Sequence, residues 1–291
     1  MKGFIRGICE SGQKIHTKVG ECSMFEDTPH GFIIHNKNTA FSLDETPFNT
    51  EMTDGITAAG IKRITPLMGG VTDYQLTGGD VRTSQEGFGP EIPIGINAKR
   101  VDYIIDKGGL CLLKQLKKLN GRQIRIFPID KNRVVYGTVA TIGGEDKFRG
   151  FLATVYAVKR DNTGSQVGAI IFSVFYDADY ENEENNMAAI ALAEELEGLT
   201  GVVLKKTTPG KAKFIISCSG DDLTSTYGAT LGAPALYKDE SGANPTSVTY
   251  ATATEDLTFV PVGKYRIADA DELKAVGVEG YEGEEEFADL T

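Results

Sequence analysis

Three histidines and two of the four cysteines lie within the first 35 residues, and both residue types bind zinc. They are Cys9, His16, Cys22, His30 and His35. A zinc finger combines two closely spaced cysteines with two histidines three to five residues apart. Cys9 and Cys22 are thirteen positions apart, and only His30 and His35 fit the second half of that pattern. We therefore expect ordinary strand and loop histidines and no metal.

The acidic run from Asp177 to Asn186 invites a comparison with calcium-binding loops. With Asp177 at position 1 of an EF-hand, the glycine position holds Asn182 and the bidentate glutamate position holds Ala188. The template fails, and acidic residues before a helix are also what the helix dipole favours.

Motifs for catalysis and cofactor binding are missing from the sequence. It has no nucleophile elbow, no His-Glu-x-x-His, no dinucleotide fingerprint and no Walker loop. Adjacent or near-adjacent acids, such as Asp221 and Asp222, are common by chance among forty-one acidic residues. We expect no enzyme and no cofactor.

A basic group follows one predicted helix into the next strand and contains Lys114, Lys117, Lys118, Arg122, Arg125, Lys131 and Arg133. Strand alternation places Arg125 on an outward face together with Phe127. A nucleic-acid surface would need stacking aromatics and a clear excess of positive charge. A solvated face, a surface that matches an acidic patch on another copy, and a nucleic-acid surface remain open.

The segment from Gly108 to Tyr180 has the clearest pattern of secondary structure. Leucines at positions 112, 113, 116 and 119 form one stripe of a helix spanning 111–119, which Asn120-Gly121 ends. Two β-hairpins are then predicted, because alternating or β-branched segments flank polar turns. Their strands are 122–128, 133–142, 151–159 and 167–176.

Before this segment, short strands are predicted at 4–9, 14–22, 31–35 and 62–67, with a polar connection over residues 39–60. Residues 68–95 contain seven glycines and two prolines, and are too long for an ordinary connection. They form either a mobile surface loop or an arm that orders against a neighbouring subunit. The residues that would be buried by such an arm are Val71, Tyr74, Leu76, Phe88 and Ile92.

After the central segment, a second helix is predicted over Met187–Leu196, and a third hairpin joins strands 200–207 and 211–218. Residues 219–245 are predicted to be loops, followed by strands 247–251 and 257–262 and a short helix over 269–275. Residues 279–291 form an acidic tail that we expect to be mobile.

Composition and charge limit the classes of protein. The apolar fraction of 41%, 34 glycines and no tryptophan fit a turn-rich β protein, and no segment is apolar for long enough to cross a membrane. Residues 1–150 have a net charge of +3 and residues 151–291 of −14, which argues against general nucleic-acid affinity. The scattered cysteines are expected to be reduced thiols in a protein made in the cytoplasm.

Together these patterns predict a mainly β, α+β fold: an antiparallel β-sandwich or barrel with one or two short flanking helices and a long Gly-rich loop. We expect a β domain over residues 1–218, with an inserted arm at about 65–95, and a C-terminal β and loop extension over 219–291 that ends in the acidic tail.

Three features resemble the tail tube (major tail) proteins of tailed bacteriophages. These are the Gly-rich segment 65–95, the helix 109–121, and the strand pairs 122–142 and 150–178. The resemblance covers about half of the chain and lies in architecture. It implies a virion subunit that forms homo-oligomeric rings, usually hexameric, stacked into a tube for DNA. The long loop would reach the adjacent ring, and acidic side chains would face the lumen.

The chain exceeds a minimal tube subunit from about residue 220 onward. A capsid or head-decoration protein is the nearest alternative, although a major capsid subunit would be expected to have a long spine helix. A carbohydrate-binding β-sandwich and a hydrolase are further alternatives. The absence of tryptophan disfavours the carbohydrate-binding class, and the missing motifs disfavour the hydrolase.

Overall fold

The computed structural model describes residues 5–6, 29–85, 87–164 and 167–291. Strands account for 46% and helices for 18% of the described residues, which confirms the predicted β-rich α+β class. The chain divides into unit 1 (Met1–Gly55 and Ile61–Leu196) and unit 2 (Ile56–Gly60 and Glu197–Thr291). The division therefore falls before the third hairpin and not after residue 218, because that hairpin pairs with strands of unit 2.

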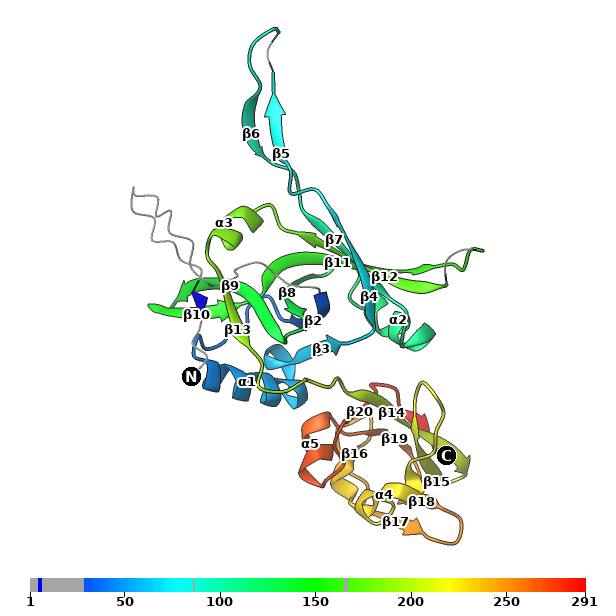
Figure 1. Ribbon diagram of the computed structural model, residues 1–291. Coiled ribbons are helices and arrows are strands. Elements are labelled where there is room, and N and C mark those ends of the chain that lie inside the picture. The colour runs from blue at the N-terminus through cyan, green and yellow to red at the C-terminus, as the bar shows by residue number, and fades with distance from the viewer. Residues whose placement is uncertain (1–4, 7–28, 86, 165–166) are drawn as a thin grey trace. The chain divides into compact units, whose positions relative to one another are not determined.

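An eleven-stranded antiparallel sheet curls into a half-barrel in unit 1 (Figure 1). Its main path runs β1-β13-β9-β8-β11-β12-β7-β4, β10 pairs with β9, and β2 pairs with both β8 and β3. The strands are β1 (Ile5–Arg6), β2 (Pro29–His35), β3 (Ile64–Met68), β4 (Val71–Thr77), β7 (Arg100–Ile105), β8 (Gln123–Asp130), β9 (Val134–Ile142), β10 (Glu145–Arg149), β11 (Phe151–Arg160), β12 (Ala169–Tyr176) and β13 (Met187–Ala191).

The two central hairpins differ in how far they pair. β11 and β12 pair from Ala153 opposite Tyr176 to Arg160 opposite Ala169, as the sequence predicts. β8 and β9 form a turn at Asp130 but pair only at Ile129 opposite Val135. β9 continues away from β8 because it pairs with β10 and β13. The hairpin formed by β9 and β10 was not predicted from the sequence.

Helix α2 (Gly109–Lys117) covers one side of the core of unit 1, as its leucine stripe predicts. Leu113 and Leu116 are buried, and Leu112 and Leu119 pack against the same cluster. The largest members of this cluster are Phe32, Tyr103, Tyr136, Phe151, Phe172, Tyr176 and Tyr180. Burial of each such side chain contributes about 1.5–3 kcal/mol to folding.

Helix α1 (Glu45–Thr57) occupies most of the segment predicted to be a polar connection, so that prediction is wrong. Phe48 and Met52, four residues apart on one helix face, are fully buried. Phe48 contacts Phe127 and Phe148 edge-on, with ring centroids 6.1 and 5.4 Å apart. β8 is therefore buried on both faces, which overturns the prediction that Phe127 points outward.

The predicted helix over Met187–Leu196 is also wrong. Met187–Ala191 is strand β13, whose side chains alternate between buried and half-buried while the backbone pairs with β9. The acidic segment before it forms helix α3 (Tyr180–Asn185) instead. The apolar and small residues of Met187–Ala191 fit the periodicity of a helix as well as that of a strand, and pairing with β9 determines that they form a strand.

Unit 2 contains a five-stranded sheet in the order β17-β18-β15-β14-β20 and a small sheet in the order β16-β19-β21. The strands are β14 (Thr200–Thr208), β15 (Lys211–Ile216), β16 (Tyr237–Lys238), β17 (Ser247–Ala251), β18 (Asp256–Val260), β19 (Lys264–Ile267), β20 (Tyr281–Gly283) and β21 (Ala288–Asp289). Its helices are α4 (Thr224–Tyr227), α5 (Ala270–Ala275) and the 3-10 turns η2 (Thr230–Gly232) and η3 (Pro234–Leu236); a further 3-10 turn, η1 (Gly60–Lys62), follows α1.

The third hairpin, the two late strands and the short helix are confirmed in unit 2. Helix α5 starts with a capping box, in which the side chains of Asp269 and Glu272 each accept a backbone N–H. The acidic tail is not mobile as predicted. Its strand β20 pairs in parallel with β14, and Leu290 is fully buried in the core of unit 2.

The predicted strands 4–9 and 14–22 lie outside the described residues except for β1, as do Cys9, His16 and Cys22. Cys111 and Cys218 are each disulfide-bonded, which contradicts the expectation of reduced thiols for these two.

Candidate functional site

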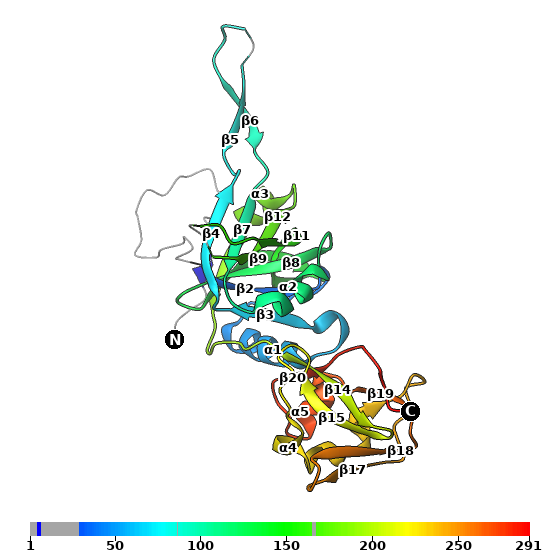
Figure 2. The ribbon, with the colours of Figure 1, turned by 90° about the vertical axis from the view of Figure 1, so that its right-hand side faces the viewer.

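The Gly-rich segment is a projecting β-arm, not a structureless loop. We use "the arm" for residues 71–98, which contain β4, β5 (Val81–Ser84) and β6 (Ile92–Ile96). β4 pairs with β7 at the edge of the main sheet, and the hairpin of β5 and β6 continues beyond that edge. Both ribbon views show this hairpin extending away from the sheet (Figures 1 and 2). Residues 65–68 of the predicted arm belong to β3 in the body of unit 1.

A glycine pair makes the junction between the two parts of the arm. Gly78 and Gly79 both have φ near +78°, a conformation that other residues adopt only with strain. A side chain at Gly78 would also come within 2.0 Å of the Ala98 carbonyl oxygen. The Gly79 N–H donates to Asn97 O at 3.1 Å, which carries the antiparallel pairing across the junction.

Large apolar side chains are exposed along the arm. Of the five predicted arm residues, Tyr74, Leu76, Phe88 and Ile92 are exposed, whereas Val71 is half-buried against the core of unit 1. Sequence reasoning missed three further exposed residues, Val81, Ile94 and Ile96. The alternation of isoleucine at 92, 94 and 96 was the available signal for them.

The apolar side chains on β4 continue two rows of the core across the sheet. One row holds Ala157, Phe172, Tyr103 and Tyr74, and the other holds Val155, Val174, Val101 and Leu76. The first three members of each row are buried, but Tyr74 is 46% exposed and Leu76 is 55% exposed. The core face of the sheet therefore extends onto the arm, where the described residues of this chain leave it uncovered.

Lys99, between β6 and β7, fastens the base of the arm to α3. Its Nζ donates to Tyr180 Oη at 2.6 Å and lies 3.6 Å from Glu184 Oε1. The same ammonium group lies 4.5 Å from the ring centroid of Tyr180, a cation–π distance. The Tyr176 N–H donates to the Lys99 carbonyl oxygen at 3.1 Å. Side chains of α3 thus hold the residue at which the arm returns to β7.

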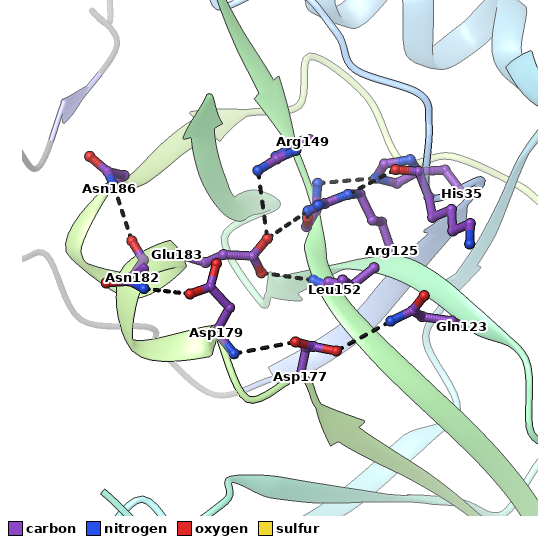
Figure 3. A network of polar contacts seen from close by, with 12 residues as sticks. His35, Gln123, Arg125, Arg149, Leu152, Asp177, Asp179, Asn182, Glu183 and Asn186 are labelled. Carbon is purple, nitrogen blue, oxygen red and sulfur yellow. Dashed lines mark hydrogen bonds and ion pairs between the residues drawn. The ribbon is translucent and has the colours of Figure 1, made fainter. Parts of the chain in front are cut away.

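A buried ion pair anchors α3 in turn (Figure 3). The Glu183 carboxylate accepts from Arg125 Nη1 at 2.9 Å and from the Leu152 N–H at 2.9 Å. Arg125 also donates to the carbonyl oxygens of Gly150, at 2.5 Å, and Lys37, at 3.0 Å. Arg125 is therefore buried and not outward-facing as predicted, because α1 and α3 both cover the face of β8 that carries Arg125 and Phe127. Its charge is compensated by one carboxylate and two carbonyl groups.

His35 completes this network from β2. The Gly150 N–H donates to His35 Nε2 at 3.0 Å, and Nδ1 lies 3.0 Å from Asn36 O, an arrangement that suits a neutral ring. Burial, assisted by the positive charge of Arg125, lowers the pKa of His35 from 6.5 to about 3. His35 is thus a neutral structural residue. His30 instead lies 3.5 Å from Glu195, so the structure does not bring these two histidines together as ligands.

The other residues considered for chemistry have structural roles or lie exposed. Asp177 accepts from Gln123 at 3.2 Å and from the Asp179 N–H at 3.3 Å, before the first turn of α3 (Figure 3). In the basic group, Lys114, Lys117, Lys118 and Arg122 are exposed on and after α2. The described residues contain no group of three or more His, Cys, Asp or Glu side chains placed to hold a metal ion.

Comparisons with known proteins give no family for this chain: no protein-family model matches it, and no curated protein matches it. Within the part of the chain that the structure describes, no helix is both long and apolar enough to span a membrane.

Proposed function

We propose that the protein is a virion structural subunit that assembles through its arm into rings, which stack as the tail tube of a tailed bacteriophage. The observation that carries this proposal is the uncovered apolar surface of the arm, which continues the core rows through Tyr74 and Leu76. A second copy of the chain would cover that surface and remove it from water, which is favourable. Strand pairing within the arm and the Lys99 contact at its base order the arm before association, so less ordering is left to association.

Charge supports the passage of DNA without specific binding. Residues 197–291 carry 16 Asp and Glu against 8 Lys and Arg, and acidic side chains that face a lumen would repel the phosphate backbone. On this proposal the subunit is made in the host cytoplasm and resides in the tail, usually as hexameric rings. It contacts other virion proteins and no membrane, and it catalyses no reaction.

Electron microscopy of the purified full chain over a range of concentrations tests the proposal. Rings, or tubes with a regular axial repeat, are the expected result. A protein that stays monomeric at every concentration and shows no rings contradicts the proposal. A subunit that forms no rings but binds the surface of a preformed capsid would instead favour a head-decoration protein.

An arm variant and a matched control sharpen this test. Val81→Thr, Ile92→Thr and Ile96→Thr together remove exposed apolar groups from the arm and keep β-branched residues that suit strands. The control, Ile61→Thr with Val167→Thr and Val260→Thr, changes exposed apolar residues elsewhere. The arm variant is expected to stay monomeric with an unchanged unfolding midpoint, and the control to assemble. Equal assembly of the two variants contradicts the role of the arm.

A further inference from the structure

We propose that the arm of one copy docks on the outer face of strands β11 and β12 of a second copy, at a surface formed by Tyr156, Val158 and Phe175. We call these three residues the outer patch. The inference rests on the proposed self-assembly and adds the surface that receives the arm.

The outer patch lies on the side of the sheet opposite the core. Tyr156 and Val158 alternate with the buried Val155 and Ala157 along β11, so they point away from the core. Phe175 shares their face, because its cross-strand partner is Thr154, two positions before Tyr156. All three are 40–50% exposed, which is unusual for large apolar side chains on three neighbouring sites.

The charged side chains beside Phe175 compensate each other. Arg100, opposite Phe175 on β7, pairs with Asp102 through Nε–Oδ1 and Nη2–Oδ2 distances of 2.8 Å. The Arg100 guanidinium also lies 4.9 Å from the centroid of the Phe175 ring. An aliphatic partner over Phe175 would therefore not leave the Arg100 charge unpaired, which is a cost that disfavours apolar docking on charged surfaces.

The arm is the partner that fits this surface. Its hairpin exposes aliphatic side chains at Val81, Ile92, Ile94 and Ile96, which complement an aromatic and aliphatic face. Among the described residues of unit 1, the other exposed large apolar side chains lie singly on separate elements and offer no second patch; they are Ile61, Leu110, Ile142 and Val167.

A copy cannot fill its own outer patch with its own arm. The β5–β6 hairpin of the arm continues from the ends of β4 and β7 and extends away from β11 and β12 in both ribbon views (Figures 1 and 2). Folding the hairpin back would break the backbone hydrogen bonds at its junction, from the Gly79 N–H to Asn97 O and from the Asn97 N–H to Asp80 O. The two surfaces therefore belong to different copies, and a contact between unlike surfaces can repeat from copy to copy into a ring or a filament.

Mixing two full-length variants tests the inference. The patch variant carries Tyr156→Thr, Val158→Thr and Phe175→Thr, and the arm variant is the Val81, Ile92 and Ile96 triple substitution described above. Each variant alone is expected to associate at least about tenfold more weakly than the natural chain, the effect of losing about 1.4 kcal/mol. Together they retain one arm and one outer patch, so analytical ultracentrifugation should detect a heterodimer and no longer species.

The outcomes separate this inference from the proposed function. A folded patch variant that assembles like the natural chain, or a mixture of folded variants without heterodimers, overturns the docking site. Heterodimers from a chain that forms no rings or tubes would support the docking site and refute the tube. A photoreactive residue in place of Ile92 gives an independent readout, with crosslinks expected to residues 154–158 or 171–175 of another copy. Crosslinks confined to other segments would exclude the outer patch even if the triple variant failed to fold.

Discussion

The ion pair between Glu183 and Arg125 allows a quantitative prediction for the replacement of Glu183 by glutamine. The side chains are only 7% and 5% exposed, respectively, so the pair is shielded from solvent and from salt. The carboxylate accepts two hydrogen bonds at 2.9 Å, from Arg125 and from the Leu152 N–H. An amide of the same shape keeps one oxygen acceptor and turns an NH2 group toward the other donor.

The expected loss in the free energy of unfolding is about 3 kcal/mol. Breaking one side of a buried ion pair costs about 3–5 kcal/mol, because the remaining charge stays buried without compensation. The lower end of this range applies because Arg125 keeps the carbonyl oxygens of Gly150 and Lys37 as acceptors. Glu184→Gln is the matched control: Glu184 is 46% exposed and 3.6 Å from Lys99, so its loss should cost less than about 1 kcal/mol.

Urea unfolding followed by pulsed hydrogen exchange measures the free energy of unfolding separately for unit 1 and unit 2. Peptides from β8 and β11 report on unit 1, and peptides from β14 and β15 report on unit 2, which should be unaffected. A loss below about 1 kcal/mol for Glu183→Gln, or equal losses for both variants, would refute the reasoning that burial makes this pair critical.

Three further predictions concern the same region. Folding lowers the pKa of His35 from 6.5 to about 3. Between these two pH values the imidazole is protonated only in the unfolded chain, so the free energy of unfolding decreases as the pH falls. His35→Gln should flatten the slope of unfolding free energy between pH 5 and 6 by about 1 kcal/mol per pH unit; an unchanged slope contradicts this. Gly150→Ala places a Cβ 2.7 Å from the Ile126 backbone and should cost about 1–3 kcal/mol in urea unfolding, whereas Gly164→Ala, with nothing within 4 Å, should cost little. Lys99→Met should raise hydrogen exchange at the base of the arm and leave unit 2 unchanged, and unaltered exchange there would argue against the fastening role.

Local patterns in the sequence predicted the elements whose signal is local. The leucine stripe of α2, the hairpin of β11 and β12, and the turn at Asp130 are examples in which periodicity and turn residues agree with the structure. Local patterns predicted the wrong element where tertiary contacts determine the secondary structure. Met187–Ala191 carries small and apolar residues that fit a helix or a strand, and only its pairing with β9 distinguishes the two.

The position of the candidate site in the chain was predicted from the sequence, but its structure was not. Length and glycine content marked residues 68–95 as either a mobile loop or an arm, and in the structure the glycines form turns and a junction within paired strands. The burial of Phe127 and Arg125 could not be predicted. Phe127 is covered by α1, whose two buried anchors Phe48 and Met52 stand in an otherwise polar segment, and Arg125 pairs with a residue of α3. Its partner Glu183 lies 58 residues further along the chain.

Irregularities within the arm hairpin have a consequence for the free subunit. A regular hairpin with exposed aliphatic side chains and open edges is a template for uncontrolled edge-to-edge aggregation and fibril growth. Pro93 has no N–H to offer such a growing sheet, and the irregular pairing at Arg82 and Thr83 leaves Ile94 as an extra residue that bends β6. The arm of a free subunit is therefore protected from edge-to-edge pairing. On the proposed assembly, side-chain contacts, which require a complementary face, would be the route by which the arm associates.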